Sequence, residues 1–90
     1  MAQPGSLDEY YTGVGTLTDS LALAGASEQA ADLMNALRSG STFGECLSNT
    51  GVVLRVLVND PAVTAAGLRD EVRGLQDQCR ALWDRANGRP

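Results

Sequence analysis

Two cysteines, Cys46 and Cys79, are the residues of this 90-residue chain with the greatest chemical potential. A cysteine attacks a substrate or binds a metal as its thiolate, which forms at neutral pH beside a cationic group or a metal. The chain has no histidine and no lysine, so it lacks the usual general base and the amine for Schiff-base chemistry. Two sulfurs are too few for a four-ligand zinc site. The sequence therefore predicts no enzyme, no catalytic residues, no cofactor and no metal.

Both cysteines fall among regularly spaced apolar residues, which predicts buried thiols in a reducing compartment. A disulfide or a redox-active pair is the alternative. Residues 1–6 are followed by the acidic Asp8 and Glu9, without the basic and apolar regions of a secretory signal. We therefore expect an intracellular and most simply cytoplasmic protein.

The net charge of −4 argues against nucleic-acid binding, which normally needs a basic surface. The longest apolar stretch, 52–58, is interrupted by Arg55 and is too short for a membrane span. Residues 40–44 are glycine-rich but lack the Gly-Lys-Ser/Thr of a phosphate-binding loop. We expect neither a membrane nor a small-molecule substrate as a ligand.

Apolar residues recur at spacings of three and four along most of the chain, which is typical of helices with one buried face. The expected helices cover residues 7–24, 28–39 and 43–57, and a longer one covers 61–87. Their predicted starts are a capping box at Ser6–Glu9, an N-cap at Ser27, a second capping box at Thr42–Glu45, and an N-cap at Asp60 before Pro61. The predicted core positions of the first three helices are Leu7, Tyr10, Val14, Leu17, Leu21, Ala24, Ala30, Leu33, Met34, Leu37, Phe43, Leu47, Thr50, Leu54 and Leu57.

Residues 51–58 also allow a different interpretation, because four of them are valines and β-branched side chains favour strands. A single strand without a partner would leave its backbone groups unpaired. The helix is therefore the preferred prediction, and the strand is the alternative.

The segment 61–87 has a heptad-like stripe, with Ala65, Val72, Cys79 and Ala86 alternating with three leucines. Short connections between helices favour antiparallel neighbours. The fold class predicted is all-α, a small antiparallel helical bundle of about four helices with a long C-terminal coiled-coil-like helix. Residues 6–87 are expected to form one domain between flexible ends at 1–5 and 88–90.

A domain this small buries a modest core, so a partner subunit would stabilise it. The long stripe either forms this core or pairs with another chain. Trp83, the one tryptophan, flanks the stripe, and either Tyr10 or its neighbour Tyr11 must lie off the core face. The predicted partner-binding residues are Leu68, Val72, Leu75, Leu82, Trp83 and Tyr11.

These features predict a small helical interaction or assembly subunit, an adaptor or scaffold component of a homodimer or larger complex. The alternative is an acidic inhibitor or immunity-type protein that masks a basic site on a target. Residues 1–45 favour it, because they carry six acidic residues and a single arginine, Arg38.

Overall fold

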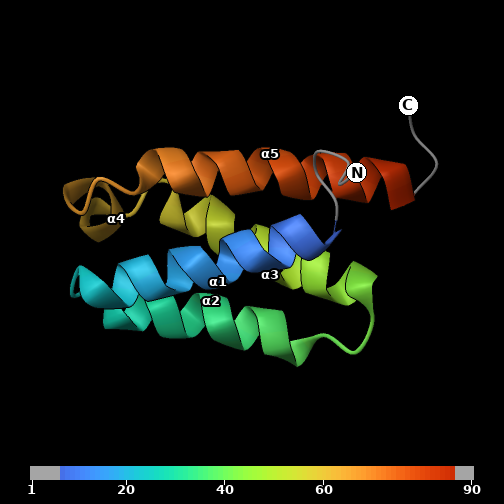
Figure 1. Ribbon diagram of the computed structural model, residues 1–90, viewed down its shortest axis with the longest axis horizontal. Helices are drawn as coiled ribbons and strands as arrows, with labels where there is room; N and C mark the ends of the chain where they lie inside the picture. The colour runs from blue at the N-terminus through green and yellow to red at the C-terminus, as the bar shows by residue number, and fades with distance from the viewer. Residues whose placement is uncertain (1–6, 87–90) are drawn as a thin grey trace.

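The structure is a computed structural model that describes residues 7–86, and within this range it contains helices and turns but no strand (Figure 1). The protein is all-helical, as the sequence predicts. The five helices are α1 (Leu7–Leu23), α2 (Ser27–Ser39), α3 (Phe43–Leu57), α4 (Pro61–Ala65) and α5 (Arg69–Ala86). The helix prediction for 51–58 is confirmed to Leu57, and the strand alternative is wrong.

The four long helices lie side by side, and the short α4 sits at the end where α3 leads into α5 (Figure 1). The principal contacts join α1 to α2, α2 to α3, α3 to α5, and α5 back to α1. Each long helix therefore has two long neighbours and buries one face between them.

The buried face of each helix follows the apolar spacing of its sequence. Side chains that are fully or almost fully buried include Tyr10, Val14, Leu17, Leu21, Leu33, Leu47, Leu54, Leu57, Val63 and Val72. Two predicted core positions are wrong, because Ala24 and Phe43 lie at helix ends and are exposed. Leu7, Met34 and Leu37 are partly buried, and the sequence analysis missed the buried Ala36.

The helix starts agree with the predictions in two of three described cases. The Thr42 hydroxyl accepts a hydrogen bond from the Glu45 amide, at 3.2 Å, and the Asp60 carboxylate accepts one from the Ala62 amide, at 2.8 Å. The prediction for Ser27 is wrong, because the N-cap of α2 is Ala26 and no side chain caps it. The capping box at Ser6 and the flexible ends at 1–5 and 88–90 lie outside the described residues.

The prediction of one helix over 61–87 is also wrong, because the chain turns between α4 and α5. Gly67 has a φ of 73°, and the Leu68 amide donates to the Val63 carbonyl at 3.1 Å. Together with the Gly67–Thr64 bond of 3.0 Å, this is a Schellman termination of α4. The regular apolar spacing hid this break, and Ala65 is exposed as a result.

Gly13 has a different role, because it lets α1 approach α5 closely. A Cβ atom placed on Gly13 would lie 2.7 Å from Leu75 Cδ2. The helix is continuous from Leu7 to Leu23 although Gly13 and Gly15 lower its intrinsic propensity. Tertiary packing against α5 therefore compensates for the weak local preference.

Replacing Gly67 by alanine should lower the free energy of unfolding by about 1 kcal/mol, because the left-handed conformation disfavours a Cβ atom. No neighbouring atom lies within 4 Å of that Cβ, so backbone conformation is the only cause. Gly15→Ala is the matched control, since its Cβ also meets nothing within 4 Å but its backbone is helical. In urea unfolding, G15A should be as stable as the wild type or up to about 1 kcal/mol more stable. If G67A and G15A change the free energy of unfolding by the same amount, this explanation is wrong.

Candidate functional site

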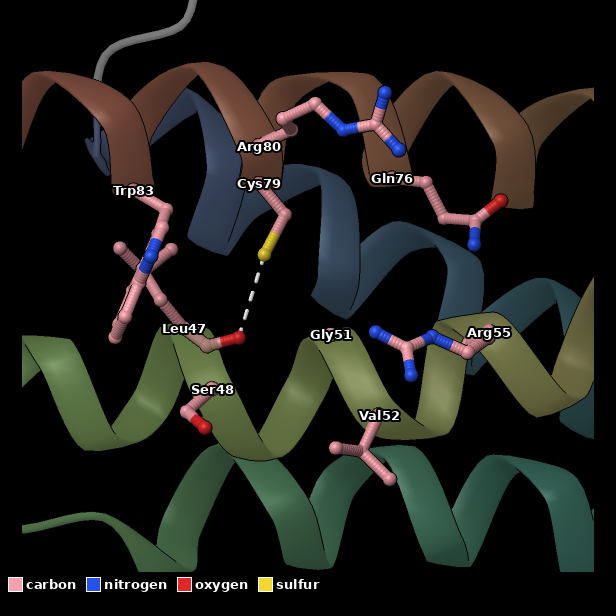
Figure 2. A pocket seen from close by; sticks show the side chains of 9 residues that line it. All are labelled: Leu47, Ser48, Gly51, Val52, Arg55, Gln76, Cys79, Arg80 and Trp83. Carbon is pink, nitrogen blue, oxygen red and sulfur yellow. Dashed lines mark hydrogen bonds between the residues drawn. The ribbon is translucent and has the colours of Figure 1, made fainter. Parts of the chain in front are cut away.

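The two cysteines are free thiols and both are buried. The Cys79 thiol donates to the Leu47 carbonyl at 3.3 Å (Figure 2), and the Cys46 thiol lies 3.4 Å from the Leu37 carbonyl. The prediction of buried thiols is confirmed, and the disulfide alternative does not hold in this structure. The Cys46 thiol thus links α3 to α2, and the Cys79 thiol links α5 to α3, each through a backbone carbonyl.

A polar cluster inside the core joins α1 to α3 and lies beside Cys79 of α5. The Tyr10 and Thr50 hydroxyl oxygens lie 2.5 Å apart, and Thr50 donates to the Cys46 carbonyl at 2.7 Å. Because the Thr50 hydrogen is used in that bond, Tyr10 donates to Thr50. Each buried hydroxyl therefore has a partner, as buried polar groups require.

Burial sets the ionisation of this cluster. Loss of hydration raises the pKa of Tyr10 well above its ordinary value of 10.0, and burial likewise raises the pKa of the Cys79 thiol above 9.0. Both groups are thus neutral at physiological pH. A raised thiol pKa is the opposite of what a reactive cysteine needs, so this cluster has the character of a structural element.

Thr50→Val should destabilise the fold more than Tyr10→Phe. Valine leaves the Tyr10 hydroxyl buried without an acceptor, at a cost of about 1–3 kcal/mol, whereas phenylalanine removes a single hydrogen bond worth about 1 kcal/mol. Thr50 keeps its bond to Cys46 in the phenylalanine variant. Chemical denaturation of both variants measures the difference, and a more stable T50V than Y10F would refute Tyr10 as the donor to Thr50.

Stability should also fall at alkaline pH. The folded state holds the Tyr10 and Cys79 protons more tightly than the unfolded chain does, since both pKa values are raised on folding. The free energy of unfolding should therefore be unaffected by these groups below about pH 8 and decrease as the pH rises beyond about 9 to 10. Denaturation midpoints between about pH 7 and pH 11 test this prediction. Above about pH 10, the free energy of unfolding should decrease less in Tyr10→Phe than in the wild type. An equal decrease in the wild type and the variant would contradict the prediction.

The six residues predicted to bind a partner lie in different environments. Val72, Leu75 and Leu82 are buried in the core of this chain, and Leu68 is partly buried against it. The stripe of α5 therefore forms the core of the domain, which was the first of the two interpretations. Val72, Leu75 and Leu82 are therefore not available on the surface of the folded chain.

Of the other two predicted contact residues, Trp83 is exposed, whereas Tyr11 is partly buried, as Leu68 is. The Trp83 side chain is 42% exposed, and Tyr11 is partly buried with its ring centroid 6.2 Å from that of Tyr10. Trp83 lines a groove between α3 and α5, but Tyr11 is not among its lining residues. The structure does not gather all six residues into one site.

The α3–α5 groove has a volume of about 270 Å³ and is lined by residues from both helices (Figure 2). Leu47 and Trp83 form an apolar end, where the indole ring points from α5 toward α3. Arg55 projects into the groove from α3, and Arg80 lies along its α5 edge. The groove thus combines an aromatic side chain with two cations and contains no acidic residue.

A second groove lies on the other side of α3, between it and α2. The α2–α3 groove has a volume of about 650 Å³, and its charged lining residues are Glu28, Asp32 and Asp60. Asp60 is engaged in capping α4 and accepts a hydrogen bond from Gln29 at 3.2 Å. No arginine lines this groove.

Val52 and Val56 form an exposed apolar ridge on α3 between the two grooves. Their side chains are 56% and 63% exposed, and Val52 lines both grooves. The sequence pattern did not predict this α3 ridge, because the valines of 51–58 bore only on the choice between helix and strand. The signal was present: both valines fall off the Leu47–Leu54–Leu57 stripe and are four residues apart, on one face of the helix.

Neither a metal site nor a membrane-spanning helix is found in the described part of the chain. Residues 7–86 contain no cluster of three or more side chains suited to hold a metal ion. Over the same range, no helix combines the length and apolar character needed to cross a bilayer. A third pocket of about 250 Å³ lies where α4 meets the turn between α1 and α2, but alanines and Gly25 alone line it.

Together these features define an all-helical protein whose most distinctive surface is an apolar helix ridge between two grooves of opposite charge. No family model, curated protein or solved structure matched the chain when it was compared with each of these groups.

Proposed function

We propose that this protein is a small helical interaction or assembly subunit whose four long helices form an antiparallel bundle, and that the α3 ridge with its two grooves is the contact surface. The observation that carries the proposal is the exposure of Val52 and Val56 in the middle of a helix whose other face is fully buried. Exposed apolar patches flanked by polar residues are typical of protein interfaces.

The energetics support this role. Burying the remaining exposed part of each valine would contribute about 1 kcal/mol, and the half-exposed Trp83 is the kind of residue that anchors an interface. Neither thiol is placed for catalysis, so the proposal assigns the protein no reaction and no small-molecule substrate. Two free cysteines fit a reducing intracellular compartment, where we place the protein.

The double variant Val52→Ser, Val56→Ser should weaken association about tenfold or more, because it removes two apolar contacts worth about 1 kcal/mol each. The protein purified from its native host should sediment as an assembly, alone or with a bound partner, and the variant should not. Leu23→Ser is the matched control, since Leu23 is 89% exposed at the far end of α1 and outside both grooves. A wild-type protein that sediments as a monomer at micromolar concentration, with no co-purifying partner, would refute the proposal.

The acidic inhibitor is a second candidate, and the acidic α2–α3 groove favours it. Salt distinguishes the two functions. An electrostatically steered inhibitor should bind its target much more slowly as ionic strength rises, whereas contacts made chiefly by the α3 ridge should change little in rate.

A further inference from the structure

The two grooves beside α3 are complementary in charge. Arg55 and Arg80 are the charged residues that line the α3–α5 groove, whereas Glu28, Asp32 and Asp60 are those that line the α2–α3 groove. Arg55, Arg80, Glu28 and Asp32 are all exposed. One molecule therefore presents, on two sides of a single helix, both halves of an electrostatic contact.

These charges are not neutralised within the molecule. Among residues 7–86, no hydrogen bond or ion pair engages the guanidinium groups of Arg55 and Arg80, or the carboxylates of Glu28 and Asp32. Glu28 and Asp32 are four residues apart on α2 and share one face of that helix. The pair of carboxylates thus matches the pair of cations in number and in exposure.

We propose that the partner at this surface is a second copy of the chain. The α2 helix of one copy lies in the α3–α5 groove of the next, where Glu28 and Asp32 meet Arg55 and Arg80. In the same contact, Val52 of the second copy, which lines that groove, packs against α2 of the first. This inference rests on the proposed function and specifies its partner.

The apolar residues support the same arrangement. Val52 lines both grooves, so docking at either one covers it, and docking at the α2–α3 groove also covers Val56. Val52 and Val56 line the α2–α3 groove beside the half-buried Val53, so this face of the first copy adds apolar contacts to those of the acidic residues. Burial of the ridge supplies affinity, and the charges select the orientation.

The contact joins two different surfaces of the same protein, so it is heterologous. Each copy has one cationic groove and one acidic groove, and can bind two neighbours. Such contacts build closed rings or open filaments, whereas a symmetric dimer joins identical surfaces. The expected assembly therefore contains more than two chains at high concentration.

Charge exchange tests this inference. The variant Arg55→Glu, Arg80→Glu makes both grooves acidic, and the variant Glu28→Arg, Asp32→Arg reverses the two acidic residues of α2. Each variant alone should self-associate about tenfold or more weakly than the wild type, because like charges then face each other. An equimolar mixture of the two should associate again, since each acidic surface regains a basic one. Light scattering after size exclusion measures the molar mass of each sample, and circular dichroism confirms that both variants are folded.

The matched control is Arg73→Glu, Arg85→Glu, which makes the same change in net charge on exposed positions of α5 outside both grooves. It should associate like the wild type. If both arginine variants weaken association equally, net charge is the cause and the groove assignment fails. If the mixture of complementary variants stays dissociated, the inference also fails.

Two outcomes separate this inference from the proposed function. A wild type that is monomeric alone, but binds another protein from its host in a manner sensitive to Val52→Ser, Val56→Ser, refutes the second copy and supports an interaction subunit. A wild type that is monomeric and binds no partner refutes both.

Discussion

The packing of α5 between α1 and α3 is the contact on which the rest of the structure depends. Val72, Leu75 and Leu82 supply its apolar side chains, all buried. The approach is close because glycines face α5 from both neighbours: a Cβ on Gly13 would overlap Leu75, and one on Gly51 would lie 3.3 Å from the Cys79 sulfur. Backbones that approach this closely leave little room for a larger side chain at Gly13 or Gly51.

The position of α5 also determines the surface. When its apolar stripe is buried, Arg80 and Trp83 are left on the side that faces α3, and they become one wall of the α3–α5 groove (Figure 2). The opposite wall comes from the face of α3 that carries Val52 and Arg55. The stripe that could have paired with another chain is thus used inside the molecule, and the residues beside it remain for contact with a partner.

Chemically reactive side chains contribute to stability in this protein. Tyr10, Thr50 and Cys79 meet in the core, where burial keeps the phenol and the thiol protonated. Hydrogen bonds to backbone carbonyls satisfy the polar atoms of Thr50 and both cysteines. Buried polar groups arranged in this way favour one packing of the helices over others, because a shifted arrangement would leave them without partners.

The amino-acid sequence by itself determined the helical class, the helix starts at Thr42 and Asp60, and most of the buried residues. These features depend on the spacing of apolar residues and on helix caps formed within a few residues, so they can be predicted from the sequence. The burial of Tyr10 was predicted, and Tyr11 beside it is less buried because adjacent helical residues point in different directions.

Only the tertiary structure decided which apolar residues stay exposed and which charges lie together. The break at Gly67 was hidden, because a Schellman turn can interrupt a helix without disturbing the apolar spacing. The α3 ridge and its two grooves depend on the neighbours that α3 acquires, and Arg55 and Arg80 are 25 positions apart in the chain. The spacing of residues along one helix determines which of them share a face. The residues that line a groove, however, depend on how two helices pack against each other.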